Sequence, residues 1–228
     1  MDTNRETEVN NLLKGYNMML YFAGSMIMYE PTEECITDFW SKGILRNLPV
    51  ESRNPRFMEA ASQLRGSCLD KATCRLLLME DYSRLFTSPG YAVAVPLKSL
   101  WAPEDPEGDA RDYDPGRFYE SYGWKPKLRN RLPDDHLGTE ILFLTLLTDK
   151  LASFDDEACR REMKKEIRKF IKDHIFSWVP QWNNMVQESA GSMCYKGIST
   201  LILACAEDIY ALLDSDNDLY FSLNNLKN

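Results

Sequence analysis

Asp134, Asp135 and His136 are the residues of this chain whose types and spacing most suggest chemistry. They follow Pro133 and precede an apolar run, so they lie where a helix is expected to begin. An aspartate at a helix start caps free backbone N–H groups, and its charge suits the positive end of the helix dipole. Capping accounts for the aspartates but does not require His136, one of only two histidines in 228 residues. We interpret this surplus polar group as the first sign of a binding site.

Catalysis by the same residues is the first alternative to consider. An aspartate and a histidine could act as orienter and base, with a cysteine as nucleophile. Asp135 and His136 are adjacent, however, so their side chains would diverge by about 100° around a helix. The sequence also lacks a nucleophile turn, a phosphate-binding loop and a dinucleotide-binding motif. We therefore expect no catalytic residue and no enzyme activity.

The overall composition excludes two further classes of site. The chain has 27 Lys and Arg against 35 Asp and Glu, a net charge of −8, whereas nucleic-acid binding depends on clustered cations. The six cysteines form no C-x-x-C pair, and two histidines are too few to complete a zinc site with them. We expect no nucleic-acid partner, no metal and no cofactor. Scattered cysteines of this kind indicate reduced, mostly buried thiols in a cytoplasmic protein.

The segment from Leu12 to Tyr29 is rich in apolar residues and must be distinguished from a leader or a membrane span. It has no positively charged lead and no clear cleavage site, and Lys14, Asn17 and Gly24 interrupt it. Its apolar residues recur at helical spacing along one side, which predicts an amphipathic core helix. We expect no stable membrane insertion and a cytoplasmic location.

Helical periodicity dominates the whole chain and predicts an all-α fold. Helices are expected at 12–29, 31–45, 56–65, 71–86, 118–122, 135–151, 155–172, 173–188 and 192–213. Residues 87–116 break the pattern with prolines and glycines, and a loop this long is often functional. The connection at 123–132 is basic. We predict a single domain over 1–228 with about nine to ten helices, two lobes hinged at 87–134, and a C-terminal tail at 214–228.

Five short motifs occur in order along the middle of the chain. Each combines a turn or a helix boundary with charged or aromatic residues. They are Asp81-Tyr82-x-Arg84-Leu85-Phe86-x-x-Pro89-Gly90, Pro96-x-x-Ser99, Tyr119-x-x-x-Gly123, Pro133-Asp134-Asp135-His136-Leu137-x-x-Glu140 and His174-x-x-x-Trp178-x-Pro180. In this order and spacing the chain resembles the TorD/DmsD/NarJ-like chaperones of molybdoenzymes.

The resemblance implies a TorD-like helical fold and a maturation role in the cytoplasm. Members of this family bind the twin-arginine signal peptide of an apo-molybdoenzyme and keep the enzyme from export until its cofactor is inserted. Such a binder needs an apolar groove for the hydrophobic stretch of the peptide and acids for its arginine pair. The partner implied is therefore the apo-enzyme with its leader, and the chaperone is expected to be a monomer or a homodimer.

The resemblance also assigns the residues of a peptide site. The groove would use apolar and turn residues, namely Leu85, Phe86, Pro89, Pro96, Ser99 and Trp101. The arginine pair would meet the polar residues Asp134, Asp135, His136 and Glu140. On composition alone, Leu85 and Phe86 indicate core packing and Asp134 indicates a helix cap. The alternative function is a helical adaptor or assembly chaperone for a non-exported oxidoreductase subunit or another protein.

Overall fold

The structure is a computed structural model that describes residues 3–34, 43, 47–67, 71–88, 90–102 and 114–214. Within these ranges every regular element is a helix, which confirms the expected all-α class. The expected helix at 31–45 lies largely outside the described residues, as does the tail beyond Asp214. No described helix combines the length and apolar character needed to cross a membrane.

Most helices lie close to the expected ranges, but the helix expected from residue 12 begins at Thr3 and the one expected from residue 173 begins at Val179. The α-helices are α1 (Thr3–Met28), α3 (Pro55–Gly66), α4 (Lys71–Tyr82), α5 (Lys98–Trp101), α6 (Pro115–Ser121), α7 (Leu137–Ala152), α8 (Glu157–Phe170), α9 (Val179–Ser189) and α10 (Met193–Leu212). Two wider π-helical turns, η1 (Ser83–Thr87) and η2 (Ile171–Phe176), extend α4 and α8. Side chains of Asn54, Asp156 and Ser192 cap α3, α8 and α10, so local capping residues set these starts.

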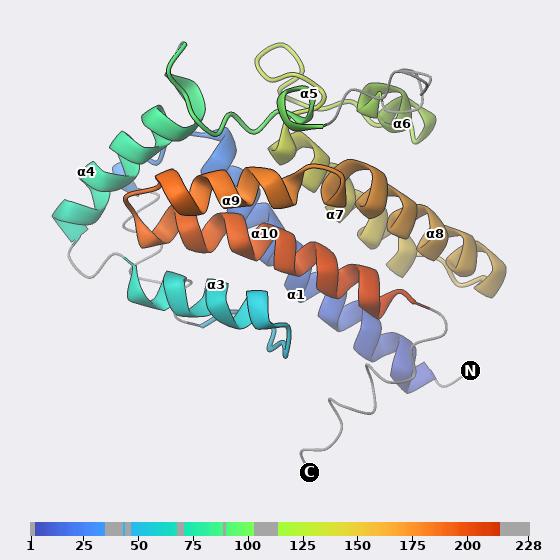
Figure 1. The fold of residues 1–228 in the computed structure, drawn as a ribbon. Coiled ribbons are helices and arrows are strands. Elements are labelled where there is room, and N and C mark those ends of the chain that lie inside the picture. Colours follow the sequence, from blue (N-terminus) through green and yellow to red (C-terminus); the bar gives the residue numbers. More distant parts are fainter. Residues whose placement is uncertain are drawn as a thin grey trace.

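Helix α10 occupies the centre of the molecule (Figure 1). It packs against α1, α3 and α9, and α1 packs in turn against α7. Fifteen residues of α10 are buried, more than in any other described helix. The buried apolar side chains of all these helices form one contiguous core.

Helices α1 and α7 approach each other closely at Gly138. A Cβ atom at this position would lie 2.2 Å from Cγ of Met28 on α1, a separation that no packed side chain tolerates. The missing side chain therefore permits the contact between the two helices. Because Gly138 belongs to the first turn of α7, this contact also positions the preceding residues, Asp134 to His136, relative to α1.

The expected long loop at 87–116 is more structured than its composition predicts. Residues 98–101 form the short helix α5, and Leu97 forms an isolated antiparallel bridge with His136. Residues 103–113 lie outside the described part. Backbone hydrogen bonds from Lys98 N to Asp135 O (3.1 Å) and from Leu137 N to Pro96 O (2.9 Å) make the bridge. Long-range pairing thus orders a segment that has no helical periodicity of its own.

The cysteines depart from expectation at one position. Cys194 and Cys205 are buried thiols, as expected, and Cys159 is an exposed thiol. Cys74, in contrast, is disulfide-bonded. The expectation of reduced thiols is therefore wrong for Cys74.

Candidate functional site

His136 is the N-cap of α7, and this corrects the expected role of the two aspartates. Helix α7 begins at Leu137, and Nδ1 of His136 accepts a hydrogen bond from Gly138 N at 3.1 Å. An acceptor at Nδ1 requires the neutral ring. Burial lowers the pKa of His136 to about 4, although the neighbouring Asp135 raises it, so the ring is neutral at pH 7. The carboxylates of Asp134 and Asp135 are thereby left for other partners.

Asp135 connects the helix start to the loop that carries α5. Its Oδ2 atom accepts a hydrogen bond from Ser99 N at 3.0 Å. Together with the bridge between Leu97 and His136, this bond places the 95–101 loop beside the start of α7. The side chain of Asp135 is half-exposed, and Ser99 is exposed, so the carboxylate remains accessible from the loop side.

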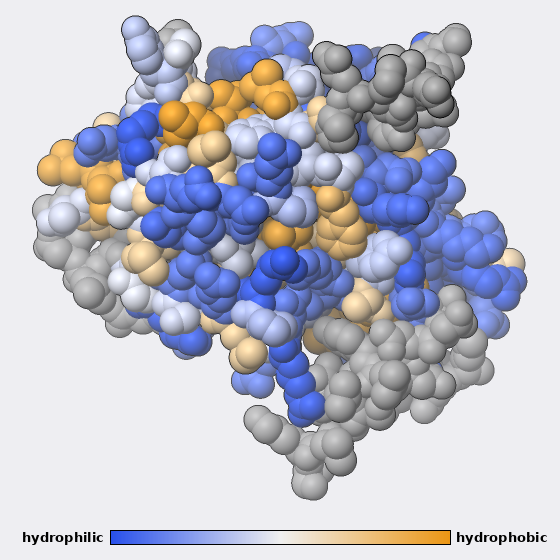
Figure 2. All heavy atoms as spheres, viewed as in Figure 1, coloured by the Kyte–Doolittle hydropathy of each residue, from blue (hydrophilic) through white to orange (hydrophobic). Residues whose placement is uncertain are grey.

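The same loop presents apolar surface to solvent. Val93 is 42% exposed and Leu100 is 63% exposed, while Leu97 and Trp101 are half-buried. Figure 2 shows this as a hydrophobic patch over the segment that leads from η1 to α5. Nε1 of Trp101 donates to Val95 O at 2.8 Å, which orients the indole along the loop. Apolar surface and an accessible carboxylate therefore adjoin each other at this end of the molecule.

Several residues expected to contact a peptide belong to the core instead. Leu85 and Glu140 are 0% exposed, Phe86 is 5% exposed and Pro96 is also buried. Phe86 packs against aromatic rings on α9 and α10, which explains why its helix turns this face inward. These four side chains offer no surface to a ligand in this conformation. Pro89 lies outside the described residues.

Glu140 belongs to a buried polar cluster beneath the helix start. Its Oε1 atom lies 3.4 Å from Nδ1 of His174. Nζ of Lys98 donates to Asp173 O at 3.0 Å and lies 3.4 Å from the same ring nitrogen. Burial raises the pKa of Glu140 well above its usual value, and burial lowers the pKa of Lys98 and of His174, the latter to about 3. Desolvation thus favours the uncharged forms here, and the cluster anchors the loop through Lys98.

Asp134 faces a different partner. Its carboxylate forms an ion pair with Arg129, whose Nη2 lies 3.1 Å from Oδ2, and its backbone carbonyl accepts from the Tyr119 hydroxyl at 2.9 Å. Burial of the Tyr119 ring raises the pKa of this phenol well above its usual value, so the hydroxyl keeps its proton as a donor. Asp134 is therefore placed by the motif that begins at Tyr119, and its side chain holds a guanidinium.

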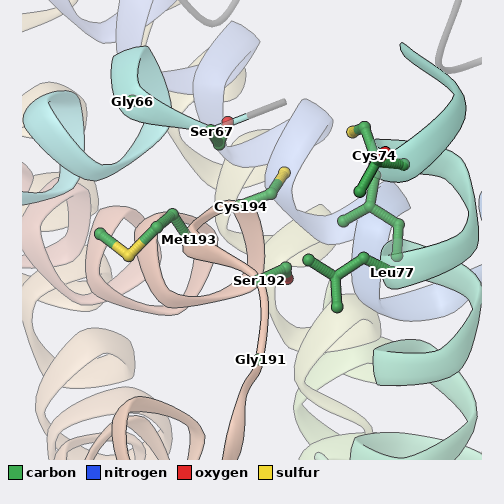
Figure 3. Close-up of a pocket in the computed structure, with 10 residues that line it drawn as sticks. Gly66, Ser67, Cys74, Leu77, Gly191, Ser192, Met193 and Cys194 are labelled. Atoms are coloured by element: carbon green, nitrogen blue, oxygen red, sulfur yellow. The ribbon is translucent and has the colours of Figure 1, made fainter. Parts of the chain in front are cut away.

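A separate pocket of about 310 Å³ lies between α3, α4 and the turn from α9 to α10. Figure 3 shows its lining, which includes Ser67, Cys74, Leu77, Ser192 and Cys194. The residues lining this pocket carry no ionisable acid or base other than the thiol of Cys194. Because it has no carboxylate, this pocket lacks the acceptor that a cationic ligand requires.

Sequence reasoning missed three residues that shape the site. Lys98 stood as a single cation within an apolar loop, a pattern that could have indicated an anchoring role. Leu100 could not be distinguished from the apolar residues around it without knowing which face is exposed. Arg129 looked like one of several cations in a basic connection, and only the fold brings it to Asp134.

Two comparisons with known proteins bear on this arrangement. Residues 52–184, more than half of the chain, match the family model described as nitrate reductase delta subunit. The chain is also similar to the chaperone protein TorD of Vibrio vulnificus, strain CMCP6, with 23% identity over 206 residues. That similarity covers 86% of this chain and 91% of the relative. Residues 52–184 contain the start of α7, the 95–101 loop and Trp182 of α9.

Proposed function

Because the chain belongs to the nitrate reductase delta subunit family, whose members are maturation chaperones for redox enzymes rather than enzymes, we propose that it serves one exported molybdoenzyme. In this proposal it binds the twin-arginine signal peptide of the apo-enzyme in the cytoplasm. It then holds the enzyme until the molybdenum cofactor has been inserted and export is permitted. No cofactor bound to the chaperone itself is needed for this role.

One observation carries the proposal: the exposed apolar loop is hydrogen-bonded to the acidic helix start. Ser99 N donates to Asp135 Oδ2 at 3.0 Å, and Leu100 follows directly with its side chain 63% exposed. A signal peptide presents arginines next to a hydrophobic stretch, so its two parts match the two parts of this surface. Burial of the apolar stretch would supply most of the affinity, at about 25 cal/mol per Å² before ordering costs. The carboxylates would supply selectivity and salt dependence.

The η1 turn supports this surface from below rather than contacting the peptide. Ala94 N donates to Leu85 O at 2.8 Å, and the bridge at Leu97 follows three residues later. Because the two contacts are so close in sequence, the η1 turn and the start of α7 can lie no more than about 15 Å apart along the connecting segment. We therefore retain a single binding site, with Ser99, Trp101, Asp134 and Asp135 at its surface and Leu85 and Phe86 beneath it.

Calorimetric titration with two synthetic leaders tests this function. One leader carries the arginine pair and the other carries two lysines in its place, so that charge is the same and only guanidinium recognition differs. We expect the arginine leader to bind more tightly, and its affinity to fall with added salt. Equal affinity for both leaders, or no binding of either, would contradict the proposal.

The family description itself supports a second candidate function. It refers to a delta subunit of nitrate reductase, which is consistent with an assembly chaperone for an oxidoreductase subunit that is not exported. Under this alternative, a leaderless client would bind as tightly as the full-length apo-enzyme. Pull-down of the two client forms by the same chaperone therefore separates the candidates.

We also keep the 87–134 region as a proposed hinge for element exchange between monomer and homodimer.

A further inference from the structure

Arg129 bridges two carboxylates at the candidate site. Its Nη2 lies 3.1 Å from Oδ2 of Asp134, and its Nη1 lies 3.5 Å from Oε1 of Glu120 on α6. The side chains of Arg129 and Glu120 are about half-exposed, whereas that of Asp134 is 21% exposed. A guanidinium of the chain itself thus occupies Asp134, one of the acids to which the proposed function assigns an arginine of the client.

The Asp134 carboxylate is built into the fold but is not saturated by Arg129. A Cβ atom at Gly116 would lie 2.8 Å from Oδ2, so the glycine makes room for the carboxylate against the first turn of α6. The other oxygen, Oδ1, is buried and has no hydrogen-bond partner among the described residues. A carboxylate that accepts a bidentate guanidinium uses both oxygens. Arg129 approaches only Oδ2, and a client guanidinium gains the second contact if the Asp134 side chain rotates to bring the buried Oδ1 to the surface.

The segment around Arg129 is the local source of positive charge. Lys125, Lys127, Arg129 and Arg131 alternate with other residues in a chain of net charge −8. An ion pair is weakened where water competes for a partner, and the Arg129 side chain is 47% exposed. The pair formed by Arg129 is therefore suited to hold the site in the free chaperone and to yield to a ligand.

We propose that Arg129 is an internal competitor that occupies the Asp134 carboxylate and must be displaced when a client arginine binds. This inference rests on the proposed function and adds a specificity-determining residue to it. A lysine ammonium cannot reproduce the two-oxygen contact of a guanidinium. A lysine of the leader therefore gains less binding free energy than an arginine does when it displaces Arg129. The competition with Arg129 thus increases the selectivity for arginine.

The test compares Arg129→Gln with Arg131→Gln in titrations with the arginine leader and the lysine leader. Both variants remove one positive charge from the same exposed segment, so long-range attraction changes equally. We expect Arg129→Gln to tighten binding of the arginine leader about three- to tenfold more than Arg131→Gln does, which corresponds to the small energy of a half-exposed ion pair. The preference for arginine over lysine should decrease in Arg129→Gln.

An equal effect of the two variants would show that only net charge matters, and weaker binding by Arg129→Gln would show that Arg129 supports the site. Either outcome overturns the inference while leaving the proposed function intact. Absence of leader binding by the wild type and by both variants would instead overturn the proposed function, and the competitor with it. A second readout is the ¹⁵N–¹H resonance of Arg129 Nε. The arginine leader should shift it in the same direction as Asp134→Asn does, and an unchanged resonance on leader binding would contradict displacement.

Discussion

Trp182 donates a hydrogen bond from its indole Nε1 to the backbone carbonyl of Ala94, at 2.8 Å and across 88 residues of sequence. The ring of Trp182 also stacks on Phe86, with centroids 6.2 Å apart. One side chain of α9 therefore fixes both the η1 turn and the segment that leads into the exposed loop. Trp182 therefore holds the backbone that leads into the candidate site.

Phe86→Ala is expected to act on folding. The ring is 5% exposed and contacts Tyr82, Trp182 and Tyr195, so its removal leaves a cavity and should cost about 3–5 kcal/mol of unfolding free energy. Urea unfolding followed by circular dichroism measures this loss. If the variant keeps wild-type stability but binds the leader poorly, Phe86 belongs to the binding surface and not to the core.

Leu100→Ala is expected to act on binding instead. The side chain is 63% exposed in the free protein, so the unfolding free energy should change by no more than about 0.5 kcal/mol. Leader binding should weaken by about 1–2 kcal/mol, because the apolar area that the peptide would cover is lost. The matched control is Leu76→Ala on α4, where the leucine is 70% exposed but lies away from the acidic helix start. Equal binding losses at both positions would contradict a localised site.

Asp135→Asn tests the charge contact without removing the backbone link. The amide oxygen of asparagine can still accept from Ser99 N, so the loop should stay in place. We expect the arginine leader to lose about 1.5–3 kcal/mol of binding free energy, if its bond to Asp135 is desolvated. Asp155→Asn removes the same charge from an exposed residue before α8 and serves as the control. Titrations at low and high salt should show a shallower salt dependence only for Asp135→Asn.

His136→Asn should flatten the dependence of stability on pH. In the folded chain burial lowers the pKa of His136 to about 4, against 6.5 for the free side chain. Between pH 6.5 and pH 4, His136 therefore binds a proton in the unfolded chain but not in the folded chain. The contribution of His136 to the free energy of unfolding is therefore complete above pH 6.5 and is lost as the pH falls towards 4.

The size of this effect can be measured from unfolding midpoints at pH 7 and pH 5. At pH 5 the wild type should have lost about 2 kcal/mol that His136→Asn retains, since asparagine caps a helix without titrating. His136→Ala should be less stable than His136→Asn at both pH values, by about 0.5–2 kcal/mol, because alanine neither titrates nor caps the helix. Parallel pH profiles of the wild type and His136→Asn would show that the ring is not held neutral by the fold.

Local signals in the sequence were sufficient to predict most of the helices. The starts of α3, α8 and α10 lie within a residue or two of the predicted boundaries, because a side chain next to the boundary caps each one. Helix α5 was not predicted. It is four residues long, and its position depends on hydrogen bonds to Asp135, 36 residues away, which no local pattern encodes.

The candidate site shows the same division between local and long-range information. The start of a helix at 134–136 was predictable, but the capping residue was not, since it depends on which side chain reaches Gly138 N. The family motifs placed Asp135 and the Pro96 loop in one expected site, and in the structure Ser99 N donates to Asp135 Oδ2. They could not distinguish surface from core for Leu85 and Phe86, because this depends on which face of the helix meets Trp182 and Tyr195.

The central position of α10 limits how this chain can be divided. Residues 52–184 match the family model and contain every residue proposed here for recognition, yet they exclude α10 and α1. A fragment with those limits would leave the inner faces of α3, α7 and α9 uncovered and should precipitate rather than bind. Client preference therefore cannot be transplanted between chaperones as a cassette. A change of client preference instead requires point substitutions in the full-length chain, in which α1 and α10 keep the core intact.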